Sequence, residues 1–283
     1  MSSQNQFGGS WTEIKIEILE TYVKQYLTVF KNQPNQKLLY FDGFAGSGDI
    51  EVDTIDESSK HTIEGAALRI LKIDSPRAFD MYYFVEKKKK LADSLEEKIK
   101  SLYPDKKFYV QAKDCNQKLI DVAKFLRSDK GKKFKVLGFI DPKGMQLEWS
   151  SLEILRGLPI DLWVLNPTSG TNRVLVRKGE MDESWLKRLE LFLGMKREDI
   201  LKHFYTKRAT LFGDLDIIKE NDPINKLHEL YASRIAGNLF KYVSNPKILR
   251  NNSGSTLFHF FMATNSEIAL RIANSVVNPK MGF

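Results

Sequence analysis

The chain has 283 residues, 42% of them hydrophobic, so it can bury a substantial core as one large domain or two small ones. Its net charge of +8 favours contact with a polyanion, although lysines interleaved with glutamates on helices are more often simply solvated. No apolar run approaches the roughly 20 residues of a membrane span, and residues 1–10 lack a signal-peptide core, so we expect a cytoplasmic protein.

The residues that build disulfides and metal sites are scarce. Cys115 is the single cysteine, which rules out an internal disulfide and a zinc site made of cysteines. The four histidines lack the spacing of metal ligands: His61, His203, His228 and His259. We therefore expect no metal.

Helices and strands alternate over the first 170 residues. Apolar residues at helical spacing predict a first helix over residues 11–32, and an apolar run predicts a strand at 38–41, buried on both faces. A polar stretch at 49–61, expected to be mobile, precedes a helix at 64–73. The further strands, each followed or preceded by a helical segment, are predicted at 81–86, 107–114, 135–141 and 161–167.

Strands separated by helices of about 10 to 15 residues predict right-handed crossovers and a Rossmann-like, doubly wound, mostly parallel α/β sheet. Residues 173–242 are predicted to be mostly helical, with no strong strand, and to form an insertion. The turn-forming NSGS between 247–251 and 256–264 predicts a C-terminal edge hairpin, which a helix at 266–277 follows. We expect a single domain over residues 1–283.

The segment YFDGFAGSG at 40–48 has the composition of a nucleotide-binding loop. Gly46 and Gly48 lack a Cβ, so they can take positive φ and let the backbone approach a ligand. Asp42 stands where the first strand ends, which is where ligands of open α/β sheets bind. The stretch therefore predicts a nucleotide-type pocket.

Acidic residues also end three later strands. Glu86 ends the second strand, Asp114 and Cys115 follow the third, and Asp141 and Pro142 end the fourth. Each acid alone could simply cap the following helix, and Asp114 most readily. Together with the glycine loop, however, they predict a cofactor site at one edge of the sheet.

FDGFAGSGD resembles the first motif of class I S-adenosylmethionine-dependent methyltransferases, in the DPFAGSG form of enzymes that methylate exocyclic amines of bases. It is less similar to the GxGxxG of NAD-binding proteins. The resemblance implies S-adenosylmethionine as cofactor, with Glu86 on the ribose and Asp114 near the adenine. The expected cofactor-binding residues are Asp42, Phe44, Gly46, Gly48, Glu86, Asp114 and Cys115.

At closer range the chain resembles the three-Cys-motif partner protein family (TcmP) nearly end to end. The resemblance lies in GGSWTEIKIEILETY, YFDGFAGSGD, EGAALRIL, YYFVEK, the Asp-Cys-Asn at 114–116, FIDPKGMQLEW, DLWVLNPTSGTNRVL and HFFMATNS. It implies a methyltransferase-like fold and a partner protein with a three-cysteine motif that looks iron-sulfur-binding. It does not imply a known reaction. Lys143 departs from the family, where aromatic residues are common at this position.

Amine methylation needs a carboxylate and a neighbouring carbonyl that accept hydrogen bonds from the target NH2, and an aromatic ring that stacks on the flipped base. Asp141 and Pro142 are therefore the candidate catalytic residues. Because Lys143 cannot stack as an aromatic ring does, Trp149 or Trp11 would have to provide that surface, although a tryptophan is more often part of the core.

The segment after the fifth strand is a further candidate for substrate binding. Asn166 lies at the same predicted edge of the sheet, and Arg173, Arg177 and Lys178 could hold phosphates. The alternative is an ordinary loop and the start of a helix.

Three functions remain open from the sequence. The first is a methyltransferase that acts on a base of DNA or RNA. The second is a cofactor-binding, catalytically silent partner subunit of a three-cysteine-motif protein, which Lys143 motivates. The third is an NAD-type Rossmann enzyme, which the glycine pattern disfavours.

Overall fold

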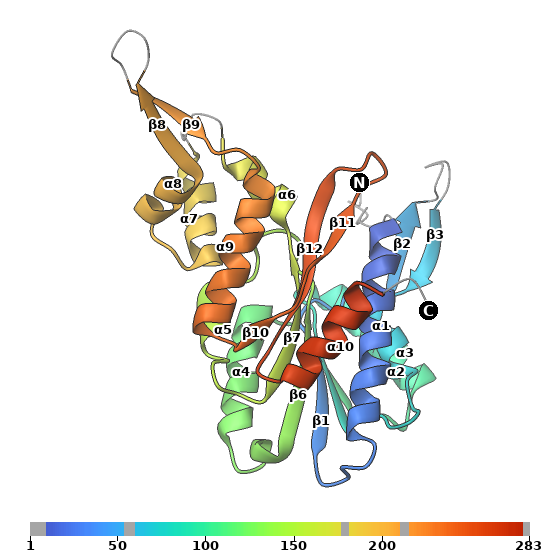
Figure 1. Cartoon of the computed structure of the whole chain (residues 1–283). Helices are drawn as coiled ribbons and strands as arrows, with labels where there is room; N and C mark the ends of the chain where they lie inside the picture. The colour runs from blue at the N-terminus through green and yellow to red at the C-terminus, as the bar shows by residue number, and fades with distance from the viewer. Residues whose placement is uncertain (1–9, 54–59, 177–180, 210–214, 280–283) are drawn as a thin grey trace.

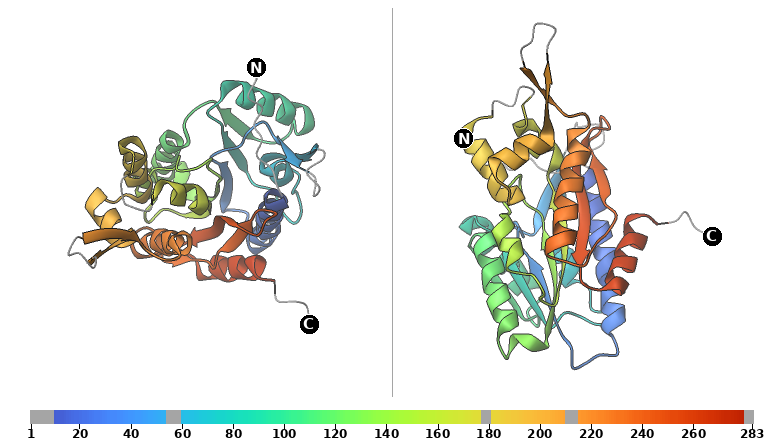
Figure 2. Two further views of the ribbon diagram at one scale, coloured as in Figure 1. Left: turned by 90° about the horizontal axis from the view of Figure 1, so that it is seen from above. Right: turned by 60° about the vertical axis from the view of Figure 1, so that its left-hand side comes forward.

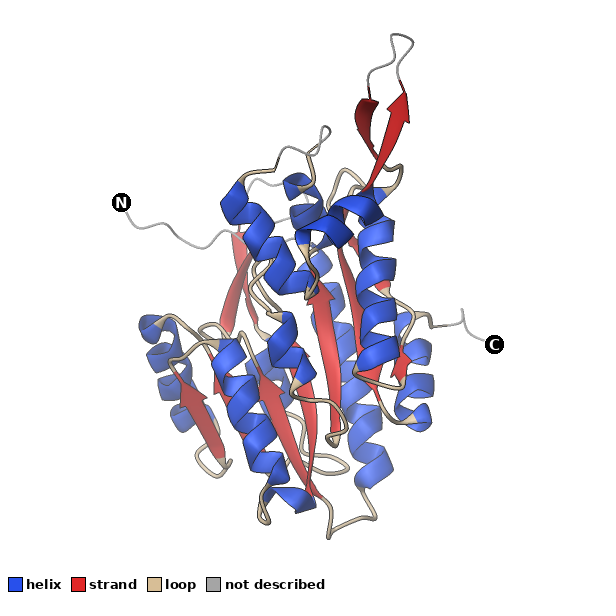
Figure 3. Ribbon diagram, turned by 90° about the vertical axis from the view of Figure 1, so that its left-hand side faces the viewer, coloured by secondary structure: helices blue, strands red, loops and turns tan. Residues whose placement is uncertain are grey.

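A mixed sheet runs through the molecule, with helices against both of its faces (Figures 1 and 3). The computed structural model describes residues 10–53, 60–176, 181–209 and 215–279. The strands lie in the order β5 (Phe108–Gln111), β4 (Met81–Val85), β1 (Lys37–Asp42), β6 (Phe134–Ile140), β7 (Ile160–Asn166), β12 (Thr256–Thr264) and β10 (Tyr242–Val243).

The strands from β5 to β7 are parallel, whereas β12 is antiparallel to its neighbours. β10 and then β11 (Lys247–Arg250) pair with the same side of β12, so together they complete the sheet. The predicted doubly wound, mostly parallel sheet and its C-terminal edge hairpin are thus confirmed. The first view of Figure 2, from above, shows helices on either side of this sheet.

The apolar run in β1 shows why the strand is buried on both faces. Leu38 and Tyr40 belong to one hydrophobic core, whereas Leu39 and Phe41 belong to the other, because alternate residues of a strand face opposite sides. The sheet therefore separates two cores, and each needs its own layer of helices.

One core lies beneath α1 (Ser10–Phe30), α2 (Ala66–Leu71), α3 (Lys89–Leu102) and α10 (Glu267–Val277). The other lies beneath α4 (Cys115–Arg127), α5 (Trp149–Glu153), α6 (Thr168–Val174), α7 (Glu183–Leu193), α8 (Arg197–Phe204) and α9 (Pro223–Asn238). A 3-10 turn, η1 (Gly131–Lys133), leads into β6. None of the described helices is long and apolar enough to cross a membrane.

Two hairpins correct the sequence predictions. The stretch at 49–61, expected to be a mobile polar segment, contains β2 (Asp49–Asp53) paired with the start of β3 (Lys60–Glu64), while residues 54–59 lie outside the described part. Ile50 and Ile63 are opposite each other and pack on the core beneath α1, so apolar residues at alternate positions stabilise the pair.

The second hairpin lies within 173–242, where only helices were predicted. β8 (Tyr205–Ala209) pairs with β9 (Leu215–Lys219), and the pair extends beyond the body of the molecule (Figure 1). Tyr205 is buried, whereas Ile218 is 38% exposed. A short pair of strands without a long apolar run lacks the signal that marks a core strand, which explains why it was missed.

Candidate cofactor and catalytic site

Several of the predicted site residues meet at the carboxyl edge of the parallel strands. After β1 ends, the backbone still forms hydrogen bonds with both neighbouring strands. Gly43 N donates to Phe139 O in β6 at 2.9 Å, and Ala45 N donates to Val85 O in β4 at 2.9 Å. The first turn of the glycine loop is therefore fixed between β6 and β4. Asp42 and Glu86, which the sequence placed at the ends of two separate strands, face the same loop.

Gly46 is the part of the loop that faces open space. It has φ of +64°, and a Cβ built on it would meet no atom within 4 Å. Gly48, at φ of +88°, is instead packed, since a Cβ there would come within 3.1 Å of Leu68 and Leu95. The two glycines thus have different roles: Gly48 brings the loop against the helices, and Gly46 leaves room for a ligand.

Asp42 is buried beneath this loop, with 1% of its surface exposed. Its Oδ1 accepts a hydrogen bond from Phe44 N at 3.1 Å. Burial raises the pKa of Asp42 to about 8, and the nearby Asp141 carboxylate contributes to the rise, whereas the Phe44 N–H and the Lys15 ammonium oppose it. At neutral pH the carboxyl group is therefore mostly uncharged.

Glu86 joins the glycine loop to the start of α3. Its Oε2 accepts from Gly46 N at 3.2 Å, and its Oε1 accepts from Lys88 N at 2.8 Å. The residue is half-buried. Its carboxylate is therefore held beside the open space at Gly46.

Asp114 caps α4, as the alternative interpretation of this residue predicted. It accepts from Asn116 N at 2.9 Å and forms an ion pair with Lys87 at 3.1 Å. Burial favours the neutral acid, but the Lys87 ammonium and the Asn116 N–H outweigh it, so the pKa of Asp114 lies below its usual value. The cap does not exclude a role near adenine, because the carboxylate stays partly exposed.

Cys115 is buried and packs closely on the glycine loop, since a Cβ on Gly43 would lie 2.6 Å from its Sγ. Any contact of Cys115 with a cofactor would thus have to come from its backbone. The Asn116 side chain, at the start of α4, forms two hydrogen bonds with the backbone of the segment that follows β6. Its Nδ2 donates to Gln146 O at 2.9 Å, and its Oδ1 accepts from Glu148 N at 2.9 Å.

Lys15 is a functional candidate that the sequence analysis missed. Its Nζ forms an ion pair with Oδ2 of Asp141, and it is buried, whereas the Asp141 side chain is 22% exposed. The signal was a lysine on the buried face of a helix, four residues after Trp11 and four before Leu19. Helix α1 therefore contributes directly to the edge where Asp141 lies.

Trp11 reaches the same place. Lys15 Nζ lies 4.9 Å from the centroid of the Trp11 ring, and this ring lies 4.7 Å from that of Phe258 in β12. Trp11 is half-buried, so part of its surface remains accessible. The structure thus brings Trp11, Lys15 and Asp141 together.

Lys143 and Gly144 follow in the position where an aromatic residue was expected. Lys143 N donates to the Gln146 side-chain oxygen at 3.1 Å, and Gly144 takes φ of +82°, where a built Cβ would meet no atom within 4 Å. Partial burial, assisted by the nearby Lys88 ammonium, lowers the pKa of the Lys143 ammonium. Pro142, between Asp141 and Lys143, is buried.

The prediction that Trp149 provides a stacking surface is corrected. The residue is buried in the core beneath α4, and its Nε1 donates to Glu153 Oε1 at 2.9 Å. Tyr231 meets the ring edge-on at 6.0 Å between centroids, and the Arg234 guanidinium lies 4.6 Å over it. Because protein atoms cover the ring, Trp149 has no face left for a base.

The residues after β7 are divided between buried and exposed positions. Asn166 is fully buried, and neither its Oδ1 nor its Nδ2 has a hydrogen-bond partner in the described part of the chain. Arg173 lies exposed on α6. Arg177 and Lys178 lie outside the described residues.

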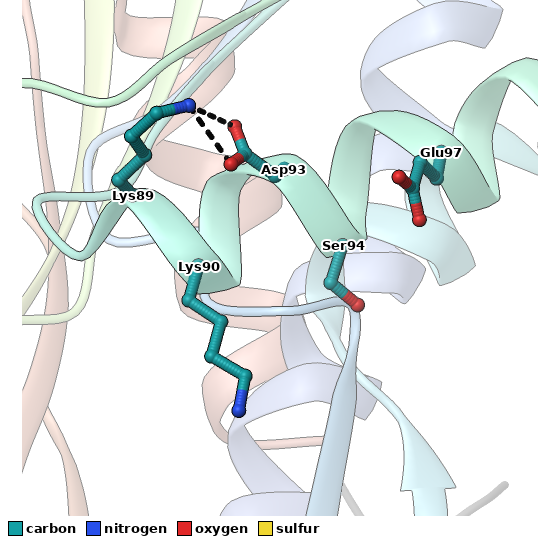
Figure 4. A pocket seen from close by; sticks show the side chains of 5 residues that line it. All are labelled: Lys89, Lys90, Asp93, Ser94 and Glu97. Atoms are coloured by element: carbon teal, nitrogen blue, oxygen red, sulfur yellow. Dashed lines mark hydrogen bonds and ion pairs between the residues drawn. The ribbon is translucent and has the colours of Figure 1, made fainter.

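A shallow depression on α3 lies apart from these groups. Figure 4 shows that its lining comes from one face of the helix, where Lys89 Nζ bonds both Asp93 oxygens at 2.9 and 3.1 Å. It is lined by Lys89, Lys90, Asp93, Ser94 and Glu97. None of these is a predicted site residue. The described ranges also contain no group of three His, Cys, Asp or Glu side chains that could hold a metal.

The strand order, the reversed β12 and the glycine loop after the first parallel strand together define the α/β fold of class I methyltransferases. No protein-family model matches the chain, and no curated protein matches it either. The resemblance to the three-Cys-motif partner family therefore stays a prediction from sequence motifs.

Solved structures resemble the chain only distantly. Protein LPL1258 of the DUF519 family, from Legionella pneumophila, shares 15% identity at a TM-score of 0.46, over 92% of this chain and 98% of that one. Trm1 from Pyrococcus horikoshii, solved with S-adenosyl-L-methionine, shares 10% identity at a TM-score of 0.45, over 93% of this chain and 57% of its own length. The putative methyltransferase YhhF from Escherichia coli shares 10% identity at a TM-score of 0.35, over 86% of each chain. Likenesses this distant give no basis for choosing a substrate.

Proposed function

We propose that this protein is an S-adenosylmethionine-dependent methyltransferase that acts on an exocyclic amine of a nucleic-acid base. The observation that carries the proposal is the hydrogen bond from Gly46 N to the Glu86 carboxylate, which lies beside the open space at Gly46. Asp141 lies at the same edge of the sheet. A ribose-binding acid, a loop that leaves room for a ligand and a candidate amine acceptor lie together there.

The cofactor would lie along residues 42–48. Glu86 would accept hydrogen bonds from the ribose hydroxyls, and Asp114 with the backbone at Cys115 would lie near the adenine. Asp42, buried beneath the loop, would lie near the positive charge of the cofactor, and such a charge lowers the pKa of a neighbouring carboxyl group. S-adenosylmethionine, when bound, supplies the methyl group that is transferred.

Asp141 and Pro142 would orient the substrate. The Asp141 carboxylate and the Pro142 carbonyl would accept hydrogen bonds from the target amine, so that the nitrogen lone pair faces the methyl group. Lys15 bonds one carboxylate oxygen, which would fix the orientation of Asp141 while the other oxygen serves the amine. Trp11, beside Lys15, is the candidate surface for base stacking.

The Lys15–Asp141 ion pair also supports a second candidate, the catalytically silent partner subunit. Lys15 already uses one acceptor oxygen of Asp141, and Lys143 replaces the aromatic residue that would stack on a base. A chain with these two features, an occupied acceptor oxygen and no aromatic residue at position 143, could bind the cofactor and assist a three-cysteine-motif protein without transferring a methyl group itself.

Calorimetry followed by methyl transfer separates these functions. We expect S-adenosylmethionine to bind and NAD not to bind. Labelled methyl should then enter one of three bulk substrates, tRNA, rRNA or DNA, and Asp141→Asn should abolish the incorporation. Tight cofactor binding without incorporation, even with the three-cysteine protein present, would support the silent subunit. If S-adenosylmethionine does not bind, both proposals are wrong.

A further inference from the structure

A buried polar cluster lies between β12 and the helical insertion, and the proposed methyl transfer does not use it. His228 of α9 stacks on His259 of β12, with ring centroids 4.3 Å apart and an angle of 8° between the planes. Both residues are buried. The rings join α9 to the sheet, and α6 also contacts both α9 and β12.

The hydrogen bonds around His259 define its neutral form. Asn225 Nδ2 donates to Asp222 at 2.7 Å, so the Asn225 oxygen, 3.3 Å from His259 Nε2, is the acceptor there. His259 Nε2 must then carry the proton. Nδ1 is left as the acceptor of the Thr168 hydroxyl at 2.9 Å. A single tautomer thus connects α6, β12 and α9.

The cluster does not stabilise a second proton on either imidazole ring. Protonation of His259 Nδ1 would force the Thr168 hydroxyl to turn from donor to acceptor and would put a positive charge against the stacked His228 ring. His228 Nδ1 has no partner among the described residues. Asn166, opposite His259 in the strand pair, carries an amide that also cannot neutralise a charge.

Among the residues that the structure describes, two charged groups act on His259. Asp222, at the start of α9, favours the cationic form of His259, whereas Arg250 of β11 opposes it. From β7 and α6 the facing side chains are Asn166 and Thr168, which do not titrate, while Arg173 of α6 is exposed. Phe261 of β12 adds an apolar ring 5.3 Å from His228.

We propose that His228 and His259 form an acid-sensitive clasp, which fastens α9 and α6 to β12 while both imidazoles are neutral and releases them when either takes up a proton. This histidine clasp is independent of the proposed methyl transfer. It makes the position of the helical insertion dependent on pH, next to the strand end that carries Asn166.

The direction of the pH dependence follows from the two rings. Burial lowers the pKa of His228 to about 3 and that of His259 to about 4, from an ordinary value of 6.5. The open form therefore binds more protons, so the clasp is fully stable above about pH 6.5 and weakens as the pH falls below it. Between pH 6.5 and the lowered pKa of a ring, each extra proton bound by the open form makes the equilibrium constant for opening rise about tenfold for every unit by which the pH falls.

Two measurements on the wild-type chain test the clasp. Long-range 1H–15N spectra of the imidazoles should show His259 protonated only on Nε2 at neutral pH. Amide exchange, corrected for its intrinsic pH dependence, should then increase in 168–174 and 223–238 as the pH falls, while 37–42 stays protected. An equal increase in 37–42, or exchange in 223–238 that does not change with pH, would overturn the proposal.

A matched pair of variants adds a second test. His228→Phe keeps a flat ring in the stack but cannot titrate, so the pH dependence of exchange in 223–238 should become weaker by up to about tenfold per pH unit. His203→Asn removes an exposed histidine from the same insertion and should leave that dependence unchanged. An equal effect of the two variants would contradict the clasp. The wild-type exchange decides the question if His228→Phe does not fold.

Discussion

A buried ammonium group needs a partner that compensates for the water it has lost, and for Lys15 that partner is Asp141. The pair places a positive charge from α1 against the end of β6, at the residue expected to bind the substrate. Trp11 lies on the same side of the helix and covers Lys15. One helix turn thus contributes both the charge and the aromatic surface to the candidate site.

Removing either partner of this pair should destabilise the fold. Lys15→Met leaves the Asp141 carboxylate without its cation, and Asp141→Asn leaves a buried ammonium group unpaired. We expect each variant to lose about 3 kcal/mol of the free energy of unfolding, at the low end for buried pairs because Asp141 is 22% exposed. Urea denaturation measures this loss.

The double variant is the control for this prediction. If the two side chains interact, the combined loss should be smaller than the sum of the single losses. Strictly additive losses would mean that the pair contributes nothing to stability.

Glu86 gives a prediction about affinity. Glu86→Gln keeps the shape of the side chain but loses the charge that strengthens its hydrogen bonds to the ribose, each worth roughly 1.5–3 kcal/mol. Calorimetry should show S-adenosylmethionine binding weakened at least about tenfold. Glu97→Gln, in the depression on α3, is the matched control and should bind normally. Unchanged affinity in Glu86→Gln would rule out the pocket assignment.

The sequence could predict that these candidate site residues lie together, because each stands at the end of a predicted strand. Asp42, Glu86 and Asp141 stand at strand ends, and parallel strands bring such ends to one edge. Lys15 could not be assigned in this way, since its partner is far along the chain and nothing local indicates the contact. Trp149 was misassigned because sequence spacing does not show which face of a tryptophan is already covered.

At the scale of elements, the end of α7 is fixed against α5. Gly194, at φ of +61°, ends the helix, and a Cβ there would lie 2.2 Å from the Trp149 ring. Glycine is thus required at Gly194 for two separate reasons, the backbone conformation and the space next to Trp149.

Gly157 allows the two effects to be measured separately, because it shares the positive φ but not the crowding. Its φ is +74°, and a Cβ built on it would meet no atom within 4 Å. Gly157→Ala should cost only the conformational strain, about 1–2 kcal/mol. Gly194→Ala should cost about 1–3 kcal/mol more, because the methyl group must displace a buried ring. Urea denaturation of the two variants compares them directly. Equal losses would show that Trp149 moves aside freely.

The elements of the sheet could be predicted, whereas the hairpins outside it could not. Core strands such as β1 and β7 are continuous apolar runs, which are uncommon elsewhere in a chain. In β2 and β3 the signal is weaker, because only alternate residues such as Ile50 and Ile63 are apolar. In β8 and β9 polar residues such as Lys207, Arg208 and Asp216 interrupt the apolar ones, so no long apolar run marks this pair.

At the scale of the whole molecule, the net charge of +8 is the property that bears on a nucleic-acid substrate. If phosphates are bound, affinity for RNA or DNA should fall steeply as salt increases. Arg173→Ser should lower the slope of log affinity against log salt by about 1 if Arg173 contacts a phosphate. Fluorescence anisotropy over a salt series measures the slope.

Arg271 is the control for this experiment. It is exposed on α10, over the core opposite to that of α6, so Arg271→Ser should leave the slope unchanged. Equal changes in the two variants would mean that only the total charge matters. Binding that does not depend on salt would favour a protein partner over a nucleic acid.

The packing of α1 against α10 affects the timing of assembly during translation. α1 is synthesised before every other described element, and α10 after them. Until the ribosome has made β12 and α10, the apolar face of α1 lacks much of the surface that it covers in the folded chain, and contacts between segments so far apart form late. Because Lys15 is part of α1, its ion pair with Asp141 is not secured before that point. A nascent chain would therefore carry the glycine loop and Asp141 well before its candidate site is complete.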